Sequence, residues 1–486
     1  MLLSMEHEEN VRWLRERLGC GRNFDCIERH LAVGGEDLTL FYIDGFVKDA
    51  ELQRVMQQLT SGDEAPSLEA TIKRLAYVEV GVSGDLSEIV SAVLSGQTAV
   101  LAASFGDQSI LIDARTYPAR QTAEPDSDRV MQGARDGFVE TLVMNTALIR
   151  RRIRDPELSM EHFSVGTSSK TDVVVCYMRG VASSELVSDI KKRIRSIKTK
   201  SLTLGYQSLS ECLIRKGWLN PFPKIRTTER PDTAAAQIME GSVILICDTS
   251  PQAMILPTSI FDYLQQTDDY YFPPLTGSYL RLVRTSILLL SLFVTPLWYF
   301  ALENATILPS FLSFVIPDAP GTLPIIVQLL LVEVAIDGLK IASMNTPDML
   351  SNSLSVIGAL ILGDFAVSVG WVCEDVILYM AFVALANFAQ QNAELGYAIK
   401  FVRVLTLLMV YALGGWGLIL GGLLFILLVS TNRSVTGKYH YLYPLIPFNG
   451  KALLRLIFRL KKNDVDEGNS RSDIKGRDAA QSENDP

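Results

Sequence analysis

The chain has 486 residues, a formal net charge of −9 and a mean hydropathy of +0.21. This acidic balance disfavours general nucleic-acid binding, because phosphate backbones attract basic surfaces. The six cysteines form no C-x-x-C pair and the four histidines lack metal-ligand spacing, so the sequence predicts no disulfide framework, metal site or other cofactor.

The hydropathy average conceals two unlike halves. Residues 1–282 have the composition of a soluble protein, whereas apolar runs dominate residues 283–429. The first residues lack a basic stretch followed by an apolar one, so we expect no signal peptide there. We therefore predict a cytoplasmic first half and a membrane-embedded second half that inserts through its own spans.

The first half contains an internal duplication. Gly96–Asp113 aligns without gaps on Gly241–Thr258, and both segments predict a helix end, a strand, a turn and a second strand. Leu38–Gly45 and Val173–Gly180 share an apolar strand followed by Tyr-x-x-Gly, each ahead of an amphipathic helix. The order of elements predicts two similar α/β lobes with mixed sheets.

The predicted fold class is an α/β cytoplasmic region of two similar lobes followed by an all-α polytopic membrane domain of four to five spans. The expected segments are an N-terminal helical segment (1–35), lobe 1 (36–120), a linker helix (121–159), lobe 2 (160–275), the transmembrane domain (283–430), an interfacial amphipathic segment (431–462) and a disordered tail (463–486).

The linker helix is predicted to end in four arginines, Arg150, Arg151, Arg152 and Arg154. Such a basic cluster can bind phosphate or lipid headgroups, or hold the cytoplasmic regions of an assembly together. The alternative interpretation is a solvated helix end, which requires no ligand.

Five apolar stretches compete as membrane spans. Two basic residues, Arg281 and Arg284, precede the first stretch, and others follow the last, so the positive-inside rule places both termini in the cytoplasm and requires an even number of spans. We favour four full spans, with either the fourth stretch or a short proline-bounded region at 307–316 entering without crossing. The stretches are Thr285–Leu302, Leu323–Ala342, Leu354–Val372, Val376–Gln390 and Val404–Val429.

The second stretch carries three charges on one helical face. Glu333, Asp337 and Lys340 are spaced i, i+4 and i+7, which places them within an arc of about 60°. Each charge near a bilayer centre costs about 2.5–3.5 kcal/mol, so this face needs a partner. Asp364 lies midway along the next stretch.

Two interpretations of these charges stay open. In the functional one, the side chains line or gate a pathway for cations or protons. In the structural one, Asp337 pairs with Lys340, and Glu333 either extends its carboxylate to the membrane interface or bonds a neighbouring helix. Four or five spans can hardly cover three charges, so we expect the partner surface to be another copy of the chain, arranged around a pore. Five glycines of the last stretch predict close helix packing or a narrow passage: Gly414, Gly415, Gly417, Gly421 and Gly422.

Several separated blocks resemble the signatures of GerA-type spore germination proteins of the A-subunit family, across residues 15–460. In the membrane half, Asp337-Gly-Leu-Lys340 is similar to the branch of the stage V sporulation AF proteins rather than to nutrient-receptor A subunits. The blocks are Glu124–Asp126, Gly133–Glu140, Asn145–Ile153, Glu229–Asp232, Glu240–Gly241 and Asp268–Tyr271, followed by Arg281 and Arg284.

This resemblance implies a multi-pass protein of the inner spore membrane, with A-type subunits around an ion-conducting pore that opens in germination. It implies an accessory role that amplifies the release of monovalent cations, with membrane lipid and another small membrane protein of the germination machinery as candidate partners. The alternative is a non-conducting scaffold that docks other germination proteins through its lobes. The sequence contains no phosphate-loop, dinucleotide-binding or G-x-S-x-G motif, so we expect no enzyme.

Overall fold

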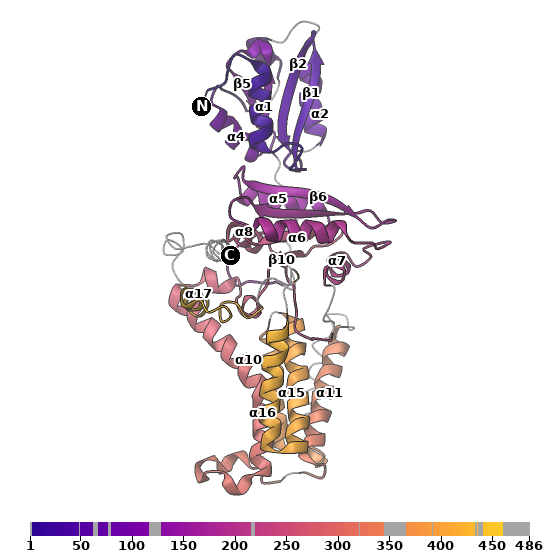
Figure 1. The fold of residues 1–486 in the computed structure, drawn as a ribbon, viewed down its shortest axis with the longest axis vertical. Coiled ribbons are helices and arrows are strands. Elements are labelled where there is room, and N and C mark those ends of the chain that lie inside the picture. The colour runs from indigo at the N-terminus through magenta and orange to yellow at the C-terminus, as the bar shows by residue number, and fades with distance from the viewer. Residues whose placement is uncertain are drawn as a thin grey trace, which may run out of the picture.

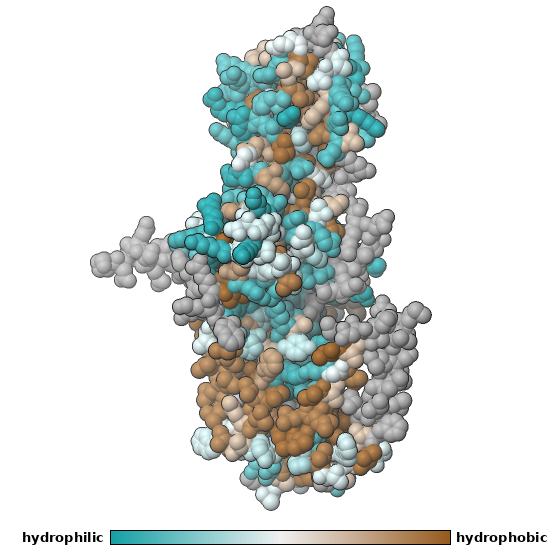
Figure 2. All heavy atoms as spheres, turned by 90° about the vertical axis from the view of Figure 1, so that its right-hand side faces the viewer, coloured by the Kyte–Doolittle hydropathy of each residue, from teal (hydrophilic) through white to brown (hydrophobic). Residues whose placement is uncertain are grey.

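The computed structural model describes residues 2–47, 49–61, 67–75, 79–115, 128–214, 219–319, 321–344, 366–390, 392–432, 435 and 441–459. Two lobes stack along the long axis, above a bundle of helices (Figure 1). Hydrophilic residues cover the lobes and hydrophobic residues gather over the helical end (Figure 2). Asp364 and the predicted tail lie outside the described residues.

Lobe 1 contains a five-stranded sheet in the order β1-β2-β4-β5-β3. Side chains alternate between its two faces, so α1 and α4 pack on one face and α2 on the other. Its elements are α1 (His7–Leu18), β1 (Cys26–Val33), β2 (Glu36–Ile43), α2 (Asp49–Thr60), α3 (Leu68–Arg74), β3 (Val80–Ser83), α4 (Leu86–Leu94), β4 (Thr98–Ala102), η1 (Ala103–Phe105) and β5 (Ser109–Ile112).

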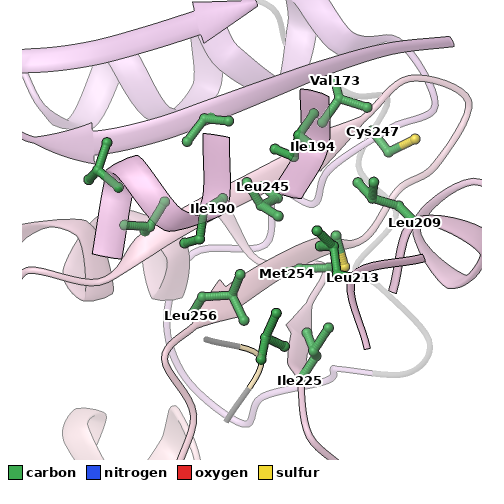
Figure 3. Close-up of a cluster of buried hydrophobic side chains, with 14 of the residues drawn as sticks. Val173, Ile190, Ile194, Leu209, Leu213, Ile225, Leu245, Cys247, Met254 and Leu256 are labelled. Atoms are coloured by element: carbon green, nitrogen blue, oxygen red, sulfur yellow. The ribbon is translucent and has the colours of Figure 1, made fainter. Parts of the chain in front are cut away.

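Lobe 2 repeats this plan with the order β6-β7-β9-β10-β8. Helices α5 and α8 cover one face, while α6 and α7 close a core with Val173, Leu245 and Met254 on the other (Figure 3). Its elements are α5 (Leu142–Arg152), β6 (Leu158–Val165), β7 (Thr171–Met178), α6 (Ser184–Arg195), α7 (Tyr206–Leu213), β8 (Arg226–Thr228), α8 (Pro231–Met239), β9 (Val243–Cys247), β10 (Ala253–Leu256), η2 (Ile260–Tyr263) and α9 (Asp268–Tyr271).

The structure confirms the internal duplication. Strand β2 begins and ends at residues that align with the two ends of β7. Helix α4 likewise begins and ends at residues that align with the two ends of α8. The ungapped alignment fails by one residue at the hairpin that follows. Thr98 pairs with Ile112 in lobe 1, whereas its counterpart Val243 pairs with Leu256, so the turn of lobe 2 is one residue shorter.

The expectation of mixed sheets is wrong for the strands that the structure describes, all of which pair antiparallel. The helical connection from β3 through α4 to β4 joins two strands that have β5 between them, so no parallel neighbours result. The predicted boundary at residue 36 also falls inside a hairpin, because β1 pairs with β2 along its whole length. Lobe 1 therefore includes this earlier strand.

The helical part begins with α10 (Pro274–Glu303), which starts well before the predicted span. Among the described residues, α10 and α15 alone are long and apolar enough to cross a membrane by length and composition, and α16 is a shorter apolar helix. The remaining elements are η3 (Ala305–Ile307), η4 (Ser310–Val315), α11 (Ile325–Met344), α13 (Ala366–Ser368), α14 (Glu374–Phe388), α15 (Ala393–Leu413), α16 (Gly415–Thr431) and α17 (Gly450–Ile457).

The single span predicted at Val404–Val429 is two helices. The chain reverses at Gly414, whose φ of 57° favours glycine, and α16 returns along α15. A Cβ on Gly417 would lie 2.2 Å from the Met409 carbonyl oxygen, and one on Gly421 would lie 2.3 Å from Thr406 Cγ2. These two glycines therefore permit close helix packing, which was one of the two predicted roles.

The bundle begins and ends on the side of lobe 2. Helix α10 leaves lobe 2 directly, and the end of α16 returns to it (Figure 1). Asn220 Nδ2 donates to the Leu428 carbonyl at 2.7 Å, and Asn432 Nδ2 donates to the Phe222 carbonyl at 3.3 Å. The far end carries η3 and η4, and η4 lies within the proline-bounded region 307–316 that was considered for entering the membrane without crossing it.

Candidate functional site

Charged side chains of α11 and α15 face each other inside the apolar bundle. Arg403 Nη2 lies 2.7 Å from Glu333 Oε1 and 2.8 Å from Oε2. Lys400 Nζ lies 3.4 Å from Glu333 Oε1 and forms a second ion pair with Asp337. The later residue of α11, Asp337, contacts the earlier residue of α15, Lys400, so the two helices run antiparallel at this site.

Burial is graded along the network. The Arg403 side chain is 1% exposed, those of Glu333 and Lys400 are 10% exposed, and that of Asp337 is 34% exposed. Arg403 Nη1 also donates to the Ser291 carbonyl of α10 at 3.3 Å. Arg403 thus joins three helices, while Asp337 is the most exposed of the four side chains in the network. A buried charge is tolerated when paired in this way, and removing one partner is strongly destabilising.

Lys340 has a different environment from the one predicted. Its Nζ lies 4.8 Å from the centroid of the Tyr397 ring, a cation–π contact with α15. Asp337 pairs with Lys400 instead of Lys340. The partners that were expected from another copy of the chain therefore come from α15 of the same chain.

Lys400 and Arg403 were not among the predicted site residues, because the last span was expected to begin at Val404. A signal was present, since Tyr397, Lys400 and Arg403 follow each other at intervals of three residues. This spacing gives one helical face that complements the face of α11. The arrangement can hold two carboxylates in the bundle while neutralising both, and a shift between α11 and α15 would expose them.

A second buried network connects lobe 2 to the start of α10. Asp269 has no exposed surface and accepts from Arg281 Nε at 3.2 Å. Arg284 binds both carboxylate oxygens of Asp269, at 3.0 and 3.1 Å, and its Nη1 also donates to the Leu264 carbonyl at 2.8 Å. These arginines were predicted as basic flanking residues of the first span. They instead fix the angle between α10 and lobe 2.

The adjoining contacts involve other residues of the recognised blocks. Asp232 accepts from Arg230 at 2.7 Å and from the Tyr271 hydroxyl at 2.9 Å. Burial alone would raise the pKa of Asp232, but the Arg230 guanidinium and the Tyr271 hydroxyl outweigh it and hold the pKa below its usual value. Arg230 Nη2 also donates to the Ala134 carbonyl at 2.9 Å. Residues far apart in sequence thus meet at one joint.

The four arginines of the linker helix do not form one surface. Arg150 is fully buried, and its guanidinium binds Asp25 at 2.9 Å, which ties α5 to lobe 1. Arg152 binds Asp136 at 2.6 Å, whereas Arg151 and Arg154 are exposed. Arg150 therefore joins the lobes within one chain and is not accessible to a phosphate, a lipid or another subunit.

No metal site is found among the residues that the structure describes, since no three of their His, Cys, Asp and Glu side chains group in a way that could hold an ion. All six cysteines are free thiols, although Cys20 and Cys26 approach to 2.8 Å between sulfur atoms.

Comparison with known proteins gives consistent matches along the chain. The family model described as "Bacillus/Clostridium GerA spore germination protein" matches residues 13–470. Stage V sporulation protein AF of Bacillus subtilis is 36% identical over 93% of this chain and 92% of its own length. The uncharacterized membrane protein YfkQ of the same organism is 29% identical, over 88% and 84%. The crystal structure of the N-terminal domain of the A subunit of the Bacillus megaterium germinant receptor GerK3 is 24% identical and covers 52% of this chain and 96% of that domain, with a TM-score of 0.39.

Proposed function

The chain belongs to the GerA family of spore germination proteins, and from that premise we propose that it is the membrane subunit of an oligomeric, ion-conducting complex acting in spore germination. It would lie in the inner spore membrane with both termini in the cytoplasm and amplify the release of monovalent cations. The ion-pair network between α11 and α15 carries this proposal.

A network of charges is energetically unfavourable in a membrane bundle. Each charge near the centre of a spanning helix costs about 2.5–3.5 kcal/mol, which apolar residues would avoid. The presence of four charged residues there is explained if they have a function in conduction: Glu333, Asp337, Lys400 and Arg403. Asp337, the most exposed side chain of the network, is positioned to meet an entering cation, while Glu333 lies further inside, bound to Arg403.

In this proposal the observed contacts represent the closed state. Lys400 and Arg403 neutralise both carboxylates, so neither is available to a cation. Opening separates α11 from α15, and the buried joint of Asp269 with Arg281 and Arg284 transmits movement of lobe 2 to α10, which also contacts Arg403 through Ser291. Identical subunits around an axis would each contribute one such face.

One observation favours the scaffold alternative. The charges are satisfied within one chain, and a network of this kind can simply fix the angle between helices. In that case the lobes would dock other germination proteins, and the network would have no contact with ions.

Cation flux into proteoliposomes separates these functions. We expect potassium flux with the wild-type protein, altered flux and selectivity with Asp337→Asn and Glu333→Gln, and wild-type flux with Glu211→Gln, an exposed acid on α7 of lobe 2. Flux and selectivity that equal those of the wild type in all three variants, at equal folded protein, would contradict conduction through this site. A scaffold would instead lose its partner complex when the lobes are deleted, and the network variants would retain it.

A further inference from the structure

The segment after α16 exposes apolar side chains beside the start of α10. Six of them are between 39% and 75% exposed, although they are the kind normally buried. The part of α10 against which α17 packs also exposes Leu275, Tyr279 and Leu282, spaced along one helical face. The six residues, called here the apolar ledge, are Leu445, Ile446, Phe448, Leu454, Ile457 and Phe458.

Hydrogen bonds connect the segment that carries the ledge to α10 and to lobe 2. Arg459 N donates to Ser278 Oγ of α10 at 2.9 Å, and Arg281 Nη1 donates to the Leu456 carbonyl at 3.3 Å. At the other end Tyr441 is buried, and its carbonyl accepts from Ile260 N of lobe 2 at 2.9 Å. Because both ends are anchored, the exposed side chains form a fixed surface.

The position and charge of this segment indicate what covers it. Helix α17 lies at the boundary between lobe 2 and the helical bundle (Figure 1), where the hydrophilic part of the molecule meets its hydrophobic end (Figure 2). From Tyr441 to Lys462 the sequence has no acidic residue and five basic ones, Lys451, Arg455, Arg459, Lys461 and Lys462. Apolar residues interspersed with basic ones in sequence have a composition that suits the surface of an anionic leaflet.

We propose that the apolar ledge lies on the membrane surface, with anionic lipid as its occupant. Such segments sink their apolar side chains about 5–10 Å into the boundary between headgroups and acyl chains. The proposal holds whether or not the complex conducts ions. It also gives the lipid a mechanical role, because the Arg281 that bonds the α17 backbone is one of the two arginines bound to Asp269.

Site-specific fluorescence on the full chain tests this contact. A nitrobenzoxadiazole label is attached at Leu454→Cys, after replacing the partly exposed Cys20 and Cys212 by serine; the other four cysteines are buried. The protein is placed at one copy per nanodisc in mixed phosphatidylcholine and phosphatidylglycerol with nitroxide-labelled headgroups. We expect blue-shifted emission and several-fold stronger quenching than at Ser188→Cys, an exposed position on α6 of lobe 2.

Equal quenching at the two positions would overturn the proposal. So would a blue shift that appears only when two copies share a nanodisc, since a second copy would then be the occupant. A final comparison tests the charge. Quenching at Leu454→Cys should fall several-fold in pure phosphatidylcholine, and Lys451→Gln with Arg455→Gln should reduce it in the mixed lipid; equal quenching throughout would contradict anionic recognition.

Discussion

Arg403 binds both carboxylate oxygens of Glu333 through one nitrogen, at 2.7 and 2.8 Å, although the two residues lie on separate helices of the bundle. The arginine is almost completely buried and the glutamate nearly so. This pair is the most buried part of the network between α11 and α15. Either helix can move relative to the other only if this ion pair breaks or rearranges.

The first prediction concerns the stability of this pair. Arg403→Met leaves the Glu333 carboxylate without its main partner, and we expect a loss of about 3–5 kcal/mol. The double variant Arg403→Met with Glu333→Gln removes the uncompensated charge and should recover part of that loss. Unfolding of the detergent-solubilised proteins by denaturant, read as a double-mutant cycle, measures the coupling. Additive losses would show that the pair contributes no coupling energy.

The second prediction concerns Asp337 and Lys400. Reversing one charge, as in Asp337→Lys, places like charges together and should lower both folded yield and cation flux. The exchange Asp337→Lys with Lys400→Asp restores an opposite pair, so we expect it to recover folded yield. If the carboxylate must project from α11 to meet ions, flux should stay impaired in the exchanged protein. Full recovery of flux would mean that only the pairing matters.

The sequence predicted some of this architecture and missed the rest for definable reasons. Periodicity identified the charged face of α11, because Glu333, Asp337 and Lys340 recur at helical intervals. The partners Lys400 and Arg403 were missed although they recur at helical spacing, since they precede the most apolar part of their helix, where the last span was expected to begin. The reversal at Gly414 was missed because both flanking helices are apolar, so hydropathy does not change across the turn. Arg281 and Arg284 resembled ordinary flanking charges, and only tertiary contact with Asp269 reveals their burial.

The third prediction follows from the lowered pKa of Asp232. Burial opposes ionisation of this carboxyl, but Arg230 and Tyr271 favour it more strongly, so its folded pKa lies below the ordinary value of 3.8. Its contribution to stability is therefore complete above that value and is lost as the pH falls through the lower folded pKa. Wild-type protein should exceed Asp232→Asn in stability by a constant amount near neutral pH, and the difference should shrink below pH of about 4. A difference that grows on acidification would contradict the assigned direction.

The last prediction uses the glycines of α16 as a matched pair. Gly417 and Gly422 lie in the same helix, but only at Gly417 would a Cβ meet backbone, 2.2 Å from the Met409 carbonyl oxygen; nothing lies within 4 Å of a Cβ on Gly422. Gly417→Ala should push α16 away from α15 and cost about 1–3 kcal/mol. Gly422→Ala should be neutral or stabilising by up to about 1 kcal/mol, because alanine favours the helix. Thermal unfolding of both variants provides the measurement, and equal midpoints would show that the two helices do not approach at Gly417. Because α15 carries Lys400 and Arg403, Gly417→Ala should also weaken the closed network, which would appear as increased basal flux.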